Sequence, residues 1–95
     1  MNKAEFFKSF EFEHCPDLDS IYLQSLWYDH QGDWARAHTL IQDLDDRVAK
    51  RIHAYLHRKE GDIWNADYWY SKAGAKRPAS SLDEEWTAIV NVLLE

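Results

Sequence analysis

Two Gly-Asp dipeptides, Gly32-Asp33 and Gly61-Asp62, divide the middle of this sequence into two copies of one pattern, offset by 29 residues. Glycine accepts the left-handed backbone that ends a helix, and aspartate can cap the helix that follows. Small and apolar residues agree at matching positions of the two copies: Ser25 with Ala54, Ala37 with Ala66, Ile41 with Tyr70 and Leu44 with Ala73. Small residues let two antiparallel helices approach closely, and one hairpin alone cannot bury its apolar face. The pattern therefore predicts two helical hairpins that stack on each other.

The boundaries of these hairpins follow from residues that start and stop helices. Pro16 suits the first turn of a helix that runs to about His30, so the first hairpin is expected at 16–44. Asp46 can cap the next helix, so the second hairpin is expected at 45–74. The alternation of apolar and polar residues that is typical of strands is absent. We therefore expect an all-α fold of tandem antiparallel helical hairpins.

Both ends of the chain also carry helix signals. Ser81 and Glu84 form a capping box at the start of an amphipathic C-terminal helix, 81–95. The Phe-rich N-terminal segment, 1–15, begins with a second capping box at Asn2 and is expected to include a short helix. A chain of 95 residues suffices for one hydrophobic core and is too short for two. The whole chain is therefore expected to form a single helical-repeat domain.

The paired hairpins resemble the tetratricopeptide repeat, and Ala66–Ala73 is also similar to the related Sel1-like repeat. The resemblance covers roughly Ile21–Ala73. It implies a TPR-like scaffold whose usual role is to bind proteins or peptides rather than to catalyse a reaction. The chain departs from the family in its short offset, in showing two copies only, and in having Gln24 and His53 where a large apolar residue is usual. The family's charged clamp for peptide carboxylates has no match, so no binding residue is transferred from it.

Charge and cysteine content narrow the classes of partner. The net charge is −6, and nucleic-acid binding or attachment to an anionic membrane requires a basic surface instead. Cys15 is the only cysteine, which excludes an intramolecular disulfide and is typical of a reducing compartment, so a cytoplasmic location is expected. These observations predict a small intracellular interaction module or adaptor that binds a protein or a peptide, or a second copy of itself.

His53 and His57 are the candidate metal ligands, because residues four apart share one face of a helix. A third ligand would have to come from elsewhere, and no recognised spacing indicates which of three residues it would be: Glu60, His38 or His14. The favoured interpretation is structural, with both imidazoles hydrogen-bonded between helices, no cofactor and no enzymatic activity. It predicts that the protein carries no stoichiometric zinc or iron. The alternative is a small metal-binding protein or metal-dependent enzyme that uses His53 and His57. A reactive thiol at Cys15, at the start of the helix that Pro16 would open, is a weaker candidate.

Trp64 and Tyr68 lie off the apolar side of the predicted helix 62–73, on a face of their own. Either another element covers them, such as the Phe-rich N-terminal segment or the C-terminal helix, or they form an exposed aromatic surface. Rigid aromatic side chains most often anchor interfaces between proteins. Trp64 and Tyr68 are therefore the candidate partner-binding residues.

Overall fold

The computed structural model describes all residues from 1 to 95 and contains helices without any strand, which confirms the all-α prediction. Six α-helices follow one another along the chain, with one 3-10 turn after the first. Their bounds are α1 (Lys3–Lys8), η1 (Ser9–Glu11), α2 (Ile21–His30), α3 (Trp34–Ile41), α4 (Arg47–Lys59), α5 (Ile63–Lys72) and α6 (Leu82–Leu93). No helix has both the length and the apolar character needed to cross a membrane.

Local capping explains where most of these helices begin. The side chains of Asp33, Asp46 and Asp62 accept hydrogen bonds from backbone N–H groups in the first turns of α3, α4 and α5. Both predicted capping boxes are present, one at Asn2 before α1 and one at Ser81 before α6. The predicted starts of these helices are therefore confirmed, because each depends on residues a few positions apart.

The start of α2 differs from the sequence-based prediction. The helix begins at Ile21 and not near Pro16, and the Ser20 hydroxyl caps it by accepting a hydrogen bond from the Leu23 N–H at 3.3 Å. Leu18 is buried in the core, and its carbonyl accepts a hydrogen bond from the Gln24 side chain at 2.7 Å. These contacts hold the preceding residues as an ordered loop, so Pro16 does not occupy a first helical turn.

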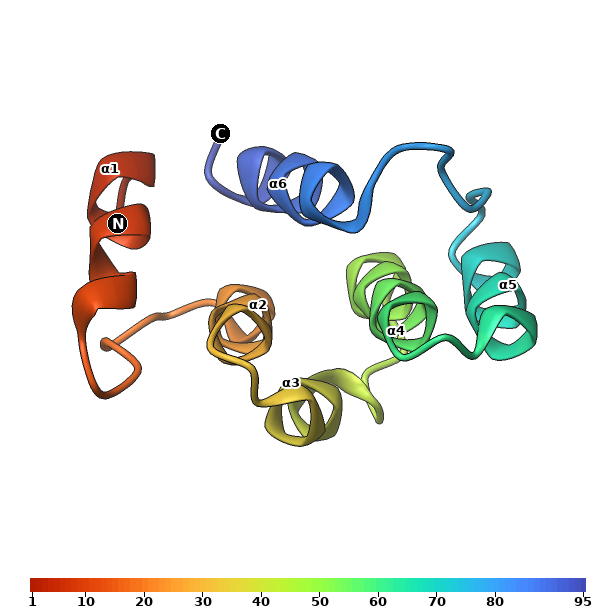
Figure 1. The fold of residues 1–95 in the computed structure, drawn as a ribbon, viewed down its shortest axis with the longest axis horizontal. Coiled ribbons are helices and arrows are strands. Elements are labelled where there is room, and N and C mark those ends of the chain that lie inside the picture. Colours follow the sequence, from red (N-terminus) through yellow and green to blue (C-terminus); the bar gives the residue numbers. More distant parts are fainter.

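Helices that follow each other in the chain pack side by side, α2 against α3 and α4 against α5, and α3 also contacts α4 (Figure 1). The small residues that were predicted to lie between paired helices are all fully buried: Ser25, Ala37, Ala54 and Ala66. The Ser25 hydroxyl donates a hydrogen bond to the Ala37 carbonyl at 2.8 Å, directly between α2 and α3. This packing is that of two consecutive hairpins.

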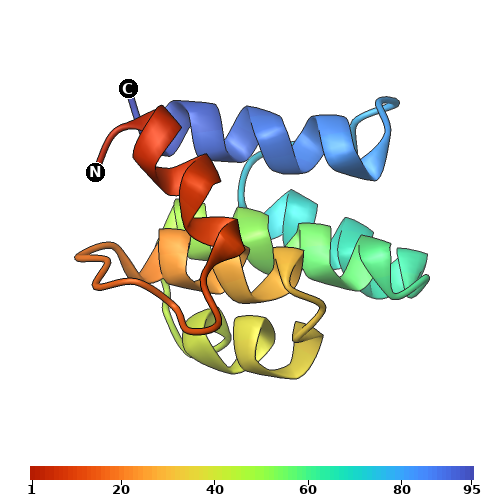
Figure 2. The same cartoon turned by 60° about the vertical axis from the view of Figure 1, so that its left-hand side comes forward.

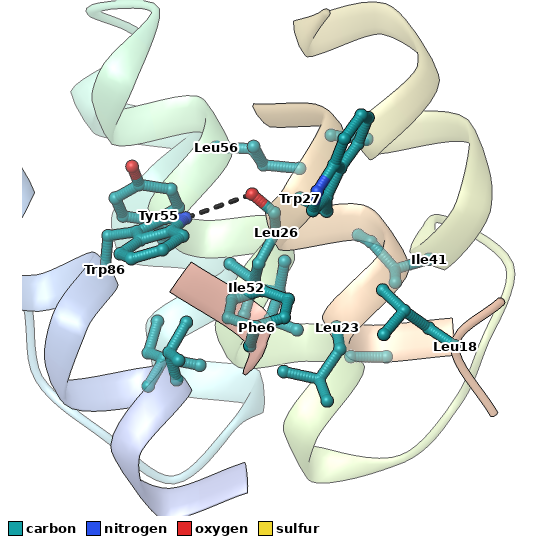
Figure 3. Packing of buried hydrophobic residues seen from close by; sticks show 14 residues of the cluster. Phe6, Leu18, Leu23, Leu26, Trp27, Ile41, Ile52, Tyr55, Leu56 and Trp86 are labelled. Atoms are coloured by element: carbon teal, nitrogen blue, oxygen red, sulfur yellow. Dashed lines mark hydrogen bonds between the residues drawn. The ribbon is translucent and has the colours of Figure 1, made fainter. Parts of the chain in front are cut away.

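Helix α6 lies across α2 and α4, on the side away from α3, and α1 lies beside it (Figures 1 and 2). Trp86 of α6 enters the main hydrophobic core, where its indole N–H donates to the Leu26 carbonyl of α2 at 3.1 Å (Figure 3). Phe6 of α1 is fully buried in the same core. The terminal helices therefore cover the face of the hairpins formed by α2 and α4.

Candidate functional site

Three histidines from two helices meet beside α5. His53 and His57 lie on one face of α4 and are nearly buried, and His38 of α3 reaches them from the neighbouring hairpin. Each of the three rings offers a nitrogen that lies within 4.8 Å of those of the other two. The shortest approach joins Nε2 of His38 to Nε2 of His53, at 3.0 Å. The structure thus brings the two predicted histidines together with a third.

Two tryptophans flank this cluster. Trp69 of α5 stacks on His53 with ring centroids 4.0 Å apart, and Trp34 of α3 stacks on His38 at 4.8 Å. The Trp34 indole N–H donates to the Leu56 carbonyl of α4 at 2.7 Å, which fixes this ring against the cluster. The imidazoles therefore lie between apolar rings instead of in open water.

Glu60 and Asn65 orient the third histidine. Nδ1 of His57 lies 2.7 Å from a carboxylate oxygen of Glu60, and an ionised carboxylate only accepts, so Nδ1 is the protonated nitrogen. Nε2 of His57 is then the unprotonated nitrogen, and it accepts a hydrogen bond from the Asn65 side-chain amide at 3.4 Å. An imidazole in this tautomer can coordinate a metal through Nε2.

The cluster also keeps two of its rings uncharged. Burial lowers the pKa of His53 to about 4, and the neighbouring His38 and His57 add to this effect. The pKa of His38 is likewise lowered by burial and by His57. Both rings are therefore neutral at neutral pH, which is the state that donates a lone pair.

The sequence alone leaves the third ligand open among three residues. Of these, His38 joins the pair, Glu60 contacts His57, and His14 is exposed and belongs to neither group of adjoining potential ligands. The two tryptophans were missed as part of the site. For Trp34 a signal was available, because it lies four residues before His38 and shares its helix face, whereas the contact of Trp69 with His53 depends on how α5 packs on α4.

Trp64 and Tyr68 form a separate aromatic surface on α5. The Trp64 side chain is 81% exposed and that of Tyr68 46%, and the two rings stack with centroids 6.5 Å apart. The ammonium group of Lys72 lies 5.4 Å from the centre of the Tyr68 ring. Neither the N-terminal segment nor α6 covers the pair, so the alternative of intramolecular burial is wrong. Both terminal elements are instead engaged over α2 and α4.

Cys15 lies outside any helix and is half-buried, and burial raises the pKa of its thiol. Activation by a helix N-terminus therefore does not apply to this thiol.

Comparisons with protein-family models, with curated proteins and with solved structures found no match.

Proposed function

We propose that this chain is a TPR-like interaction module that binds a segment of another protein through the aromatic surface of α5. The observation that carries the proposal is the exposure of Trp64, at 81%, beside the stacked ring of Tyr68. Aromatic side chains are the most frequent energetic anchors of interfaces, and exposing a large indole to water has no structural benefit for the isolated chain.

The position of α6 supports the choice of this surface. In stacked helical hairpins, the first helices of successive hairpins share one face, which here is the face of α2 and α4. Helix α6 covers that face (Figure 1), and its Trp86 donates a hydrogen bond to the Leu26 carbonyl of α2. A partner segment consequently finds α5 more accessible than the inner helices.

Charge favours a basic partner. The chain carries a net charge of −6, and the exposed carboxylates of Glu60 and Asp62 immediately precede Trp64. The faces of Trp and Tyr rings attract cations, and Lys72 already occupies such a position over Tyr68. A lysine- or arginine-bearing segment would gain both interactions, whereas two copies of this chain would repel each other at long range. The single cysteine agrees with the proposal that the module acts in the reducing environment of the cytoplasm.

The test uses Trp64 as the probe, because it is far more exposed than the other four tryptophans. A synthetic peptide rich in arginine and leucine should protect tryptophan fluorescence from an aqueous quencher, and the same peptide with glutamate in place of arginine should not. Replacing both Trp64 and Tyr68 by alanine should weaken binding of the arginine peptide, measured by calorimetry, by about 10-fold or more. Val92→Ala removes another exposed apolar side chain, on α6, and serves as the matched control.

Three results would contradict the proposal. Equal binding by the double variant and by Val92→Ala would show that the aromatic surface is not the binding site. Loss of helicity in the double variant, measured by circular dichroism, would assign the pair to the core. Concentration-dependent dimers that the double substitution abolishes would instead identify a second copy of the chain as the occupant.

A further inference from the structure

We propose that His38, His53 and His57 form a binding site for one first-row transition-metal ion, with zinc as the reference ion. The three histidines are distinct from Trp64 and Tyr68, although the Trp69 ring beside His53 contacts the Tyr68 ring edge-on at 5.2 Å, and the inference does not depend on the proposed partner. It also replaces the expectation that the protein holds no zinc, because that expectation rested on the lack of a third ligand.

The nitrogen positions fit a single tetrahedral ion. Zinc binds imidazole nitrogen at about 2.0–2.1 Å, which places two nitrogens on one tetrahedral ion about 3.3 Å apart. The nitrogens of His38 and His53 are 3.0 Å apart, and all three rings have a nitrogen within 4.8 Å of the others. Rotations of the rings would bring the three nitrogens closer to bonding distance, and the ring whose Nε2–H donates in the contact between His38 and His53 would carry its proton on Nδ1 instead, which frees that Nε2 for the ion.

Glu60 is the second feature that points to a metal. Protein-bound metals are commonly held by histidines whose other ring nitrogen donates to a carboxylate, because this fixes the tautomer and makes the ligand more basic. Nδ1 of His57 has such a partner in Glu60, at 2.7 Å. The carboxylate thus orients His57 with Nε2 unprotonated, and an ion bound there would replace the 3.4 Å contact of Nε2 with the Asn65 side-chain amide.

The surroundings suit a partly sheltered ion. Trp34 and Trp69 form apolar walls on two sides, which limits access by water. His53 and His57 are buried, whereas His38 is only half-buried. No fourth side chain lies within the same group, so water or a ligand from outside would complete a tetrahedron.

Ligand type defines the class of ion. Three imidazoles favour zinc, copper, nickel or iron, whereas magnesium and calcium require oxygen ligands. His38 belongs to the first hairpin and the other two ligands to the second, so a bound ion would link α3 to α4. A bound ion would therefore keep one coordination position open and would also stabilise the stacking of the two hairpins.

The competing explanation is that the imidazoles satisfy one another. The contact between His38 and His53, the contact of His57 with Glu60 and the tryptophan stacking provide each ring with partners. The two explanations differ in one measurable respect, which is whether the three rings act together on an added ion.

The experiment titrates untagged protein, stripped with a chelator, with zinc chloride in a calorimeter and with cobalt chloride in a visible spectrometer. We expect one zinc ion per chain, a cobalt spectrum typical of tetrahedral coordination, and a higher melting temperature with zinc but not with magnesium. His38→Gln should weaken zinc binding by about 100-fold or more, since it removes a direct ligand, and Glu60→Gln by about 10–100-fold. His14→Gln is the matched control and should bind like the unchanged chain.

Two results would overturn the site. Less than one zinc ion per chain bound to the unchanged protein at micromolar concentration would leave the imidazoles as structural groups only. Equal affinity of His38→Gln and the unchanged chain would show that the ion does not use the three-histidine arrangement. Because the stoichiometry, the cobalt spectrum and the zinc-dependent melting shift are measured on the unchanged chain, the test remains decisive even if a variant fails to fold.

Discussion

Gly32 and Gly61 each have a φ of +89°, the left-handed conformation that the repeated Gly-Asp turns require. An added Cβ at either position would meet no atom within 4 Å, so space is not the reason for glycine there. The reason is the backbone angle, which side-chain-bearing residues adopt only at a cost. Each of these two glycines is therefore required by one backbone dihedral angle, its positive φ.

Replacing Gly61 by alanine should lower the free energy of unfolding by about 1–2 kcal/mol, because alanine disfavours the left-handed backbone and gains no contact. Urea denaturation followed by circular dichroism measures the change. Gly61→Asn is the control, and its free energy of unfolding should fall by less than that of Gly61→Ala, since asparagine tolerates this conformation. An alanine variant as stable as the original would show that the turn can adopt another geometry.

At the scale of elements, the contact between paired helices depends on small side chains. Ala66 of α5 and Ala54 of α4 are fully buried and belong to the same small cluster with Tyr70. Ala37 and Ser25 are fully buried in the same way between α2 and α3. The absence of bulk at these positions is what lets the helices of each hairpin approach.

Ala66→Leu should therefore overpack the contact between α4 and α5 and destabilise the fold by about 1–3 kcal/mol. The denaturation midpoint of the variant measures this loss. The same substitution at Ala35, an exposed position on α3, should leave the midpoint nearly unchanged. If both variants had the same midpoint as the unchanged chain, the assignment of Ala66 to a close helix contact would be wrong.

At the scale of the whole molecule, two buried carboxylates connect elements that are far apart in the sequence. Asp29 of α2 accepts a hydrogen bond from the Tyr55 hydroxyl of α4 at 2.9 Å, and it also pairs with Lys59. Glu85 of α6 accepts from the Tyr70 hydroxyl of α5 and pairs with Arg58 of α4 at 2.8 Å. Together these connections join the first hairpin to the second and the second hairpin to α6.

The same connections predict instability at high pH. Burial and the adjacent carboxylates raise the pKa of Tyr55 and Tyr70 well above the ordinary value of 10.0. The unfolded chain then loses these protons at a pH where the folded chain keeps them. The resulting stabilisation is fully present below about pH 10 and is lost as the pH rises from there toward the folded pKa.

We therefore expect the free energy of unfolding, measured with urea, to fall between about pH 8 and about pH 11. At about pH 8 the Tyr70→Phe variant should be less stable than the unchanged chain. Its free energy of unfolding should fall by a smaller amount between about pH 8 and about pH 11. Tyr68→Phe alters an exposed tyrosine outside these connections and is the control. The same loss of stability in Tyr70→Phe and in the control would contradict the prediction.

Features that depend on neighbouring residues could be predicted from the sequence. The caps at Asp33, Asp46, Asp62 and Ser81 and the positive φ at the two Gly-Asp turns are local, because each requires residues within one helical turn. The burial of the small residues between paired helices was also predictable, since the repeat shows the same positions twice. The start of α2 was not, because the burial of Leu18 and its contact with Gln24 outweigh the preference of Pro16 for a first helical turn.

The candidate sites depended on tertiary structure to different degrees. Helical spacing alone placed His53 beside His57 and set Trp64 and Tyr68 on a face of their own. The packing of α3 on α4 decided whether His38 would contact His53 and His57. The position of α6 decided the exposure of Trp64 and Tyr68, because α6 lies over α2 and α4 and leaves α5 uncovered. Helix periodicity specifies which residues share a face, whereas only the packing of distant segments specifies what that face meets.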